Sequence, residues 1–311
     1  MLDASVKLGE GIEIYKVIEV KKDSGTERIV IRKPKSIDEC KMLVDIQLKI
    51  WEGDIYGIVS HYILHIANEN GGLTLGAFKE SGEAIGVLYG FLGYYHGRLI
   101  HYSHIAGVIP EYKLKGIGYH LKLAQREYVI KQGLDLIMWT FDPLQSINAR
   151  FNIRKLGALT NTYHVNYYGE MQSSLNVGLE SDRFKVEWWI KSPRVLRRLS
   201  GNFNPRLEDY LKYDYGFAIE TDVNRCGVRK PVKINLDLES KYVIVEIPYD
   251  INEIKLRDIE LARRWRYVTR EVFTNYFKRG YYIYDYVVES NRGFYVLLKE
   301  TLENILRGEY V

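Results

Sequence analysis

Between residues 99 and 133, the spacing of the apolar residues changes once, from a strand-like run to a helical repeat. The run from Leu99 to Val108 is apolar and aromatic enough to predict a strand, which Pro110 ends. Beyond it, apolar residues recur at helical spacing, and Gly133 is well placed to end the helix. These helical positions are Ile117, Leu121, Ala124 and Tyr128. The pattern therefore predicts a strand, a short basic turn that contains Gly116 and Gly118, and an amphipathic helix.

The same criteria predict the elements on both sides of this segment. Upstream they give a strand at 28–32, a capping box from Ser36 to Glu39, helices at 43–51 and 58–67, and a hairpin with strands at 72–79 and 84–94. Downstream they give a buried strand at 134–141, a helix at 146–156, and strands at 162–168 and 184–190. The C-terminal part contains predicted strands at 241–247, 281–289 and 293–298 and a helix at 254–277. This mixture of helices and strands predicts an α/β (α+β) fold.

The turn at residues 113–118 has the properties of an anion-binding site. Gly116 and Gly118 have no side chains that would keep a ligand away from the backbone. The amides at a helix start are unpaired donors at the positive end of the helix dipole, an arrangement that favours a phosphate ester. Two common phosphate motifs are excluded. The sequence contains no P-loop pattern, and Leu121 occupies the third glycine position of a dinucleotide fingerprint.

The turn resembles the pyrophosphate loop of the GNAT superfamily of acyl-CoA-dependent N-acyltransferases. The pattern of that loop is Arg or Gln, two residues, Gly, any residue, and Gly or Ala. Here Lys113 holds the first place, and Gly116 and Gly118 hold the glycine places. The preceding run from Val108 to Tyr112 resembles the usual approach to the loop. The order of predicted elements also resembles a GNAT domain over residues 27–191.

Further phrases resemble one branch of predicted GNAT acetyltransferases that carry a C-terminal extension. They lie at residues 141–144, 148–152, 155–158, 182–189 and 265–270. The resemblance implies an N-terminal extension (1–26), a GNAT acyl-CoA-binding domain (27–191) and a smaller C-terminal α+β extension (192–311). It also implies a mixed central sheet with flanking helices, in which two parallel strands, at 99–108 and 135–141, splay apart.

The resemblance further implies a set of cofactor-binding residues. In GNAT proteins the pantetheine arm fills the gap between the splayed strands, so backbone groups at Gly107 and Val108 are expected to hold it and to polarise the thioester. Asn148 resembles the asparagine that often contacts this arm. The pyrophosphate is expected to lie against Lys113, Leu114, Lys115, Gly116, Ile117 and Gly118. The implied cofactor is acetyl-CoA or another acyl-CoA, as co-substrate, with no metal.

Attack by an amine on a thioester needs a group that accepts the proton of the amine. Strict alternation along the predicted strand would place Tyr102, His104, Ala106 and Val108 on one face. Relatives often carry a catalytic Glu at about the place of Tyr102. The candidate catalytic residues are therefore Tyr102 and His104, with His104 as the base, directly or through water. A structural histidine, Glu111 as the base, and a route through water alone are the alternatives.

The acid that would protonate the leaving thiolate is not evident in the sequence. Relatives commonly place a Tyr one helical turn before the glycine that ends the last helix of the domain. Here that glycine is Gly157, and the corresponding position is Ile153. Either the thiolate leaves unassisted, or Tyr163 or Tyr168 serves as the acid. Both tyrosines are also typical of residues that pack in strands.

Composition limits the compartment and the partners. The 311 residues are 46% hydrophobic, and Lys plus Arg (44) exceed Asp plus Glu (40) by four. This small excess suits a polyanionic cofactor and does not demand nucleic acid. Cys40 and Cys226 do not suggest a disulfide framework, and neither a signal pattern nor an apolar span of membrane length is present. We therefore expect a cytoplasmic protein whose partners are neither membranes nor nucleic acids.

Two further features have weaker functional interpretations. His61 and His65 have the i, i+4 spacing of a metal pair, but no acidic third ligand is evident, so a packing role is favoured. The predicted helix at 254–277 carries arginines opposite its apolar stripe, Arg266 and Arg270 among them. A solvated helix face is the favoured interpretation, and a contact with nucleic acid or CoA phosphate is the alternative.

The resemblance to these GNAT acetyltransferases implies an N-acyltransferase. It would transfer an acetyl group, or another short acyl group such as succinyl, from acyl-CoA to the amine of a small molecule by direct attack in a ternary complex. Amino acids are among the candidate acceptors. The alternative is a GNAT-fold protein that binds CoA without turnover, as a sensor or assembly partner. The sequence leaves the oligomeric state open, with a homodimer among the alternatives.

Overall fold

The computed structural model describes residues 13–22, 25–52, 55–169, 178–225 and 227–311. These residues form two compact units, one that ends at Ile137 and one that begins at Met138. The predicted division between residues 191 and 192 falls inside the second unit. Residues 1–12 and Cys226 lie outside the described residues. No described helix combines the length and the apolar character needed to cross a membrane.

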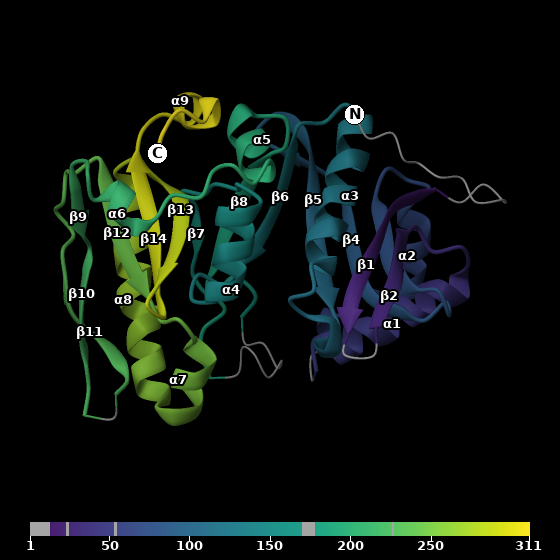
Figure 1. The fold of residues 1–311 in the computed structure, drawn as a ribbon, viewed down its shortest axis with the longest axis horizontal. Helices are drawn as coiled ribbons and strands as arrows, with labels where there is room; N and C mark the ends of the chain where they lie inside the picture. Colours follow the sequence, from purple (N-terminus) through teal and green to yellow (C-terminus); the bar gives the residue numbers. More distant parts are fainter. Residues whose placement is uncertain (1–12, 23–24, 53–54, 170–177, 226) are drawn as a thin grey trace. The chain divides into compact units, whose positions relative to one another are not determined.

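The first unit is an antiparallel sheet with helices packed on it (Figure 1). Its elements are β1 (Ile14–Lys22), β2 (Gly25–Arg32), α1 (Ile37–Ile50), η1 (Ile55–Gly57), α2 (His61–Ala67), β3 (Leu73–Lys79), β4 (Ala84–Tyr95), β5 (Arg98–Val108), η2 (Pro110–Tyr112) and α3 (Ile117–Lys131). The strands follow the order β1-β2-β3-β4-β5. The stripe predicted for α3 packs into the core, where Ile117, Leu121 and Ala124 are at most 2% exposed.

The strand β1 lies before residue 27, where the predicted domain begins. It pairs antiparallel with β2 along its whole length. Ile18 and Val20 point into the core of the unit, while Val17 and Glu19 on the opposite face are exposed. The described part of the predicted N-terminal extension therefore supplies a strand to the sheet.

The predicted capping box at the start of α1 is only half formed. The Ser36 hydroxyl accepts a hydrogen bond from the Glu39 amide at 3.3 Å, as predicted. The Glu39 carboxylate instead accepts from the Lys35 amide at 2.7 Å and from the Arg32 guanidinium at 2.6 and 2.8 Å. Glu39 thus joins the start of α1 to the end of β2, because the charged donor of Arg32 forms a stronger bond than a neutral amide does.

The second unit contains the remaining elements. They are β6 (Leu136–Phe141), which begins at the boundary, α4 (Ser146–Ala149), the π-helix η3 (Arg150–Lys155), β7 (Tyr163–His164), β8 (Arg183–Trp189), α5 (Pro193–Leu199), α6 (Leu207–Tyr210), β9 (Tyr215–Phe217), β10 (Ile219–Val223), β11 (Arg229–Ile234), β12 (Tyr242–Ile247), α7 (Ile251–Arg257), α8 (Ile259–Lys278), β13 (Tyr281–Glu289), β14 (Arg292–Lys299) and α9 (Leu302–Arg307). The strands β6, β8 and β7 are neighbours in that order, and β10 pairs with β11.

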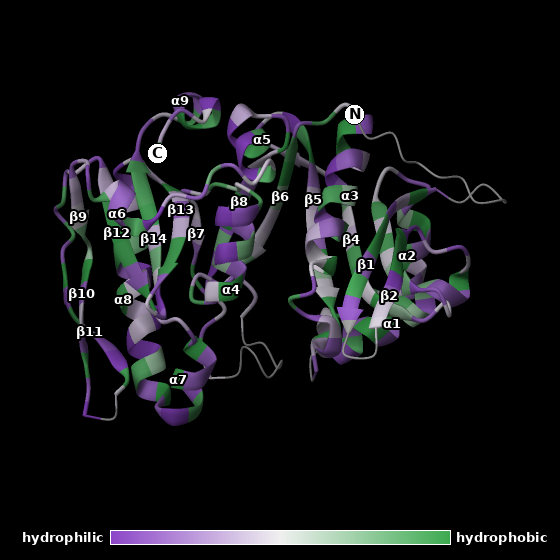
Figure 2. Ribbon diagram, viewed as in Figure 1, coloured by the Kyte–Doolittle hydropathy of each residue, from purple (hydrophilic) through white to green (hydrophobic). Residues whose placement is uncertain are grey.

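A separate C-terminal sheet has the order β13-β14-β12-β9 and is mixed, because β9 runs parallel to β12. All six residues of β12 are buried, which agrees with its apolar colouring in Figure 2. The helix α8 packs against β12 and β13. The prediction of an α/β fold, with helices flanking a sheet and further C-terminal α+β structure, is confirmed.

Three predicted elements differ in the structure. The single helix predicted at 254–277 is two helices, because Asp258 adopts an extended backbone and its side chain caps α8 by accepting from the Leu261 amide at 2.9 Å. The helix predicted at 146–156 is one turn of α-helix followed by a π-helix, in which the Leu156 amide donates to the Phe151 carbonyl. Of the strand predicted at 162–168, only Tyr163 and His164 pair with a neighbour.

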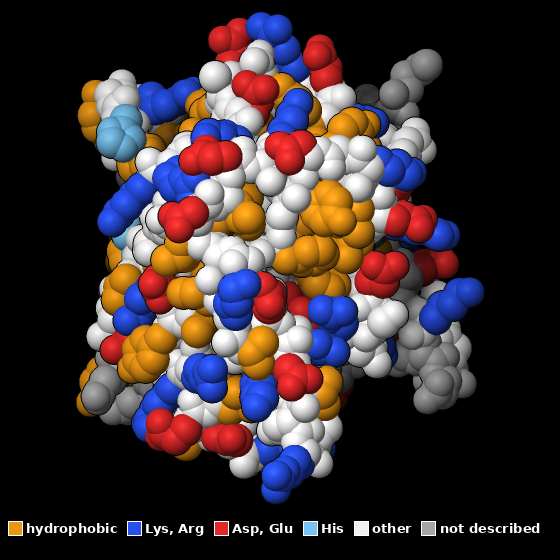
Figure 3. Space-filling model, turned by 90° about the vertical axis from the view of Figure 1, so that its left-hand side faces the viewer, with side chains coloured by type: hydrophobic (Ala, Val, Ile, Leu, Met, Phe, Trp, Pro, Cys, Tyr) orange, Lys and Arg blue, Asp and Glu red, His pale blue; other side chains and the backbone are white. Residues whose placement is uncertain are grey.

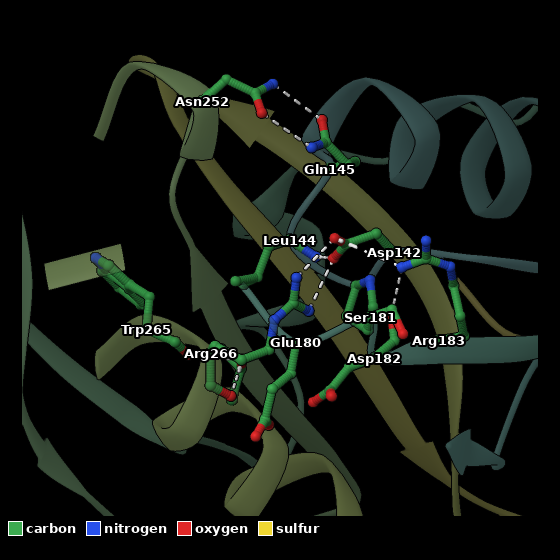
Figure 4. Close-up of polar contacts among 12 residues, drawn as sticks. Asp142, Leu144, Gln145, Glu180, Ser181, Asp182, Arg183, Asn252, Trp265 and Arg266 are labelled. Atoms are coloured by element: carbon green, nitrogen blue, oxygen red, sulfur yellow. Dashed lines mark hydrogen bonds and ion pairs between the residues drawn. The ribbon is translucent and has the colours of Figure 1, made fainter. Parts of the chain in front are cut away.

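A buried ion pair connects the end of β6 to α8 (Figure 4). The Asp142 carboxylate accepts from the Arg266 guanidinium at 2.9 and 2.6 Å and from the Leu144 amide at 2.8 Å. Burial alone would raise the pKa of Asp142, but the charges of Arg266 and Arg183 and these hydrogen bonds lower it overall. The pair therefore stays ionised at neutral pH and fixes α8 to the strand.

The predicted solvated arginine face of α8 is partly wrong. Arg266 is only 1% exposed, and Arg270 donates to the Asp182 carboxylate at 2.8 and 2.9 Å. Neither charge is free to contact a phosphate. On the face that carries β9, β10 and β11, acidic and basic side chains are interspersed around apolar ones (Figure 3). This mixture gives no support to a nucleic-acid surface there.

Replacement of Arg266 by Ala leaves the Asp142 carboxylate buried without its bidentate partner. We expect the free energy of unfolding to fall by about 3–5 kcal/mol, measured by urea denaturation. The control Arg257→Ala removes an exposed pair with Glu253, whose side chains are 60% and 56% exposed. It should cost at most about 0.5 kcal/mol. Equal losses in the two variants would contradict the structural role of Arg266.

Candidate functional site

The segment between β5 and α3 follows an unusual backbone path. Leu114 has a φ of 62° and Gly116 a φ of 84°, so both lie in the left-handed region. Left-handed geometry costs a side-chain-bearing residue roughly 1–2 kcal/mol, and the Leu114 side chain is 87% exposed, so its own packing does not offset this. Two left-handed residues so close together turn the chain sharply between Lys113 and the start of α3, and turns of this kind often expose backbone amides to anions.

Gly116 is the N-cap of α3 and provides no side-chain cap for the first amides of the helix. The first bond within the helix runs from the His120 amide to the Gly116 carbonyl at 3.2 Å. The amides of Ile117 and Gly118 therefore precede it, in the turn where a helix provides no acceptors. Gly116 has no side chain that could accept from them. Within the described part of the chain no side chain caps this helix start, and uncapped amides of this kind suit an anion.

Gly116 and Gly118 are glycines for different physical reasons. Gly116 needs its positive φ, whereas the backbone of Gly118 is helical. A methyl group added at Gly116 would meet no atom within 4 Å, and one added at Gly118 would lie 4.0 Å from Val108 Cγ2. Neither the conformation nor the packing of the chain thus requires glycine at 118. A ligand that approaches the backbone there would explain it.

Tyr112 anchors the base of the turn. It is buried, and its hydroxyl donates to Glu27 Oε2 at 2.5 Å. The ammonium groups of Lys79 and Lys115 each lie 5.3 Å from the centre of its ring. Lys113 is exposed. The turn thus has a fixed base and exposed positive charge at its rim, which suits a polyanion.

A β-bulge at His104 divides the strand β5. Along the ladder with β4, Tyr102 pairs with Phe91 and Ser103 with Gly90, but the next pair is Ile105 with Tyr89. His104 is the additional residue, and it reverses the alternation that follows. The prediction that Tyr102 and His104 share a face with Ala106 and Val108 is therefore wrong for the last two residues.

His104 and Tyr102 do lie on the same face of the sheet. The His104 ring is 5.9 Å from the Tyr89 ring and 6.1 Å from the Phe91 ring, and the Tyr102 ring is 5.5 Å from that of Phe91. His104 is exposed to solvent at one side. The surrounding protein nevertheless removes part of its water and lowers its pKa below the ordinary imidazole value. The imidazole is thus neutral at neutral pH, as a base requires.

Gly107 and Val108 end the strand on opposite faces. A methyl group at Gly107 would lie 3.0 Å from Ile50 and 3.2 Å from Trp51, so glycine is needed for the close approach of the end of α1. Val108 is buried on the side of α3. Their roles in holding the pantetheine arm stay predictions.

The other candidates lie in the second unit. Asn148 is exposed on α4, and its contact with the cofactor arm stays a prediction. The Tyr163 hydroxyl donates to Asp182 Oδ2 at 2.6 Å, and burial, together with that carboxylate, raises its pKa well above the ordinary value. Tyr163 is thus a structural residue. The Tyr168 hydroxyl lies 2.9 Å from the Thr140 hydroxyl and is half exposed.

No protein-family model and no curated protein sequence matches the chain. Solved structures do match. Naa50 of Arabidopsis thaliana, bound to a bisubstrate analogue, has 17% identity, and 51% of this chain covers 97% of it with a TM-score of 0.41. A GNAT-family acetyltransferase from Streptococcus pneumoniae has 16% identity, the same coverage and a TM-score of 0.41. PaiA N-acetyltransferase of Thermoplasma acidophilum, in complex with coenzyme A, has 21% identity, the same coverage and a TM-score of 0.34.

About half of the chain is similar to GNAT acetyltransferases. At this level of identity and structural overlap, the similar structures do not identify what the chain binds or transfers.

A buried polar cluster beneath α3 was not predicted. Lys122 is 2% exposed, and its ammonium donates to Ser103 Oγ at 3.0 Å and to Gln125 Oε1 at 2.8 Å. It connects the first half of α3 to β5, and burial lowers its pKa well below the ordinary value. The only signal in the sequence is that Lys122 and Gln125 adjoin the apolar positions of the helix.

His101 lies beside this cluster and is fully buried. Among the described residues, neither of its ring nitrogens has a hydrogen-bond partner. Burial, and secondarily the charge of Lys122, lowers the pKa of His101 from 6.5 to about 3. Between about pH 3 and 6.5, the folded protein therefore holds this histidine neutral where a free histidine is protonated.

The stability of the first unit should fall as the pH decreases from about 6.5 toward 3, because the unfolded chain protonates His101 and the folded chain does not. The contribution is about 1.4 kcal/mol per pH unit. Comparison of urea unfolding between pH 6.5 and 5 should show this slope in the wild type and lose it in His101→Leu. The exposed His65→Leu serves as the control and should keep the wild-type slope. Parallel curves for the wild type and His101→Leu would refute the burial of a neutral imidazole.

Proposed function

We propose that the chain is an acyl-CoA-dependent N-acyltransferase. It transfers an acetyl group, or another short acyl group such as succinyl, to the amine of a small molecule by direct attack in a ternary complex. The observation that carries the proposal is Gly118, a glycine that neither backbone geometry nor packing requires, in the first turn of a helix behind a left-handed anion-binding turn. Backbone amides in such a turn bind a pyrophosphate well.

The proposed chemistry assigns a task to each part of β5 and the turn. The amides from Leu114 to Gly118 hold the pyrophosphate, and backbone groups at Gly107 and Val108 hold the pantetheine arm. Acyl-CoA supplies an activated carbonyl carbon. The acceptor nitrogen forms a bond to that carbon, the carbon–sulfur bond breaks, and the proton of the amine passes to His104, directly or through water. Tyr102, on the same face, helps to position the amine.

The turn can be tested with Gly118→Glu, which adds bulk and negative charge where the pyrophosphate should lie. We expect CoA affinity, measured by calorimetry, to fall at least about 100-fold through crowding and charge repulsion. Gly118→Ala adds one methyl group where the nearest atom is 4.0 Å away. It should keep the wild-type stability and separate bulk from charge. Unchanged CoA affinity in a folded Gly118→Glu protein would refute the proposed site.

A second candidate function is CoA binding without turnover. It is favoured by Ile153, which stands where relatives carry the acid and is fully buried, so that no proton donor is present at that position. Release of free thiol from acetyl-CoA or succinyl-CoA across a panel of amines separates the two functions. CoA binding without thiol release from any amine would support the sensor.

The role of His104 can be tested through the pH profile. In the wild type, kcat/KM should decrease below pH 6.5 as His104 becomes protonated, since its pKa is lowered from 6.5. His104→Ala should lose this acidic limb and reduce kcat/KM on the order of 100-fold. The exposed His65→Ala on α2 should keep both the rate and the limb. A His104→Ala enzyme with an unaltered profile would exclude His104 as the base.

A further inference from the structure

Two buried arginines lie on one face of α5 in the second unit. Arg194 and Arg198 are one helical turn apart, and they are only 2% and 5% exposed. Their Cζ atoms lie 4.2 and 5.8 Å from the centre of the Tyr284 ring. Burial lowers the pKa of Arg194 to about 10, and the nearby charge of Arg198 contributes to this shift. Both guanidinium groups therefore keep their charge at neutral pH.

The carboxylate that pairs with these arginines has no acceptor capacity left. Arg198 Nη2 lies 3.1 Å from Asp285 Oδ1, and Asp285 is completely buried on β13. The same carboxylate accepts from the Arg154 guanidinium at 2.9 Å, from the Tyr210 hydroxyl at 2.6 Å and from the Tyr286 amide at 2.8 Å. Two carboxylate oxygens offer about four acceptor positions in total. Asp285 is thus saturated.

Three nitrogen atoms of the two arginines have no hydrogen-bond partner among the described residues. Arg194 donates from Nε to the Gly157 carbonyl at 3.2 Å and from Nη2 to the Tyr284 carbonyl, which leaves its Nη1. The other two atoms are Nε and Nη1 of Arg198. All three are out of contact with solvent. A buried donor without an acceptor is costly, and the cost is greater when the donor is charged.

The balance of charge identifies what is missing. The guanidinium groups of Arg154, Arg194 and Arg198 share one carboxylate, and arginine does not relieve such an imbalance by losing its proton. Water would accept hydrogen bonds but would leave the charge uncompensated. An anion supplies both the acceptor and the charge, and hydrogen bonds between charged partners are the stronger ones. Because the unpaired nitrogens are enclosed by packed side chains, a monatomic anion is favoured over phosphate.

We propose that a chloride ion binds at the guanidinium groups of Arg194 and Arg198 as a structural anion of the second unit. The ion accepts from their unpaired nitrogens and offsets the positive charge that Asp285 leaves unbalanced. Because both arginines belong to α5 and Asp285 belongs to β13, the bound ion fixes this helix to the C-terminal sheet. The site is separate from the turn before α3, and the inference does not depend on the proposed acyltransferase function.

The first test compares urea unfolding of the full chain in sodium chloride and in sodium gluconate at one ionic strength, so that general screening is constant. Tryptophan fluorescence reports mainly on the second unit, because four of the five tryptophans lie there. Chloride that binds only the folded site should make the unfolding equilibrium constant about tenfold smaller at about 500 mM than in gluconate.

Two neighbouring variants separate the site from a general salt effect. Arg198→Met replaces the excess buried charge by an apolar side chain and removes two of the three unpaired nitrogens, so the difference between the two salts should disappear. Arg197→Met is the matched control on the same helix. Arg197 is exposed and donates to the Gly308 and Tyr310 carbonyls, so its loss should leave the tenfold difference intact.

The second test locates the ion in the wild-type protein. Bromide replaces chloride and scatters X-rays anomalously, so crystals in sodium bromide should show an anomalous peak in contact with Arg194 Nη1 and Arg198 Nη1. A map without a peak at these atoms would overturn the proposal, and it decides the question even where Arg198→Met does not fold. A chloride effect of equal size in the wild type and both variants would also overturn it. Neither measurement involves CoA, so the proposed acyltransferase function stands or falls separately.

Discussion

One additional residue in β5 determines what each face of the strand can do. Without the bulge at His104, strict alternation would turn Val108 toward the same side as Tyr102 and would turn Gly107 toward α3. With it, Ser103 and Val108 both lie on the side of α3, while Tyr102, His104 and Gly107 lie together on the other. One strand can thus support α3 on one face and carry His104, the proposed base, on the other.

The contact that attaches α3 to β5 includes a buried polar group, whose desolvation costs free energy. A buried amine loses most of its hydration, and the Lys122 ammonium donates to the oxygens of Ser103 and Gln125. A purely apolar contact would carry no such desolvation cost. It would also be less specific, because two apolar surfaces can shift against each other by the width of a methyl group. The hydrogen bond to Ser103 sets the position of α3 along the strand. The position of the first amides of α3 relative to Gly107 therefore depends on this hydrogen bond.

The spacing of residues along the sequence predicts those elements that depend on residues close to one another in the chain. Period, proline and glycine located β5, the turn and α3 within a residue or two, and the capping hydroxyl of Ser36 was recognised for the same reason. Features that depend on distant partners could not be found. Arg266 looked solvated because its carboxylate lies 124 residues earlier, and the bulge at His104 leaves the sequence pattern of β5 intact. The capping role of Asp258 was visible in principle, but the apolar stripe continues through it.

Pyrophosphate binding and proton transfer, the two parts of the proposed chemistry, constrain the sequence to different degrees. Binding of a pyrophosphate by amides requires a fixed backbone path, which suits the positive φ of Gly116, and a close approach of the ligand to the backbone, which suits Gly118. Proton transfer requires only one group within reach, and water can substitute for it. Because a thiol is already a fair leaving group, a buried Ile153 in place of an acid slows the reaction less than the absence of a base would. The choice of acceptor then depends on the residues around His104, which include the rings of Tyr89 and Phe91.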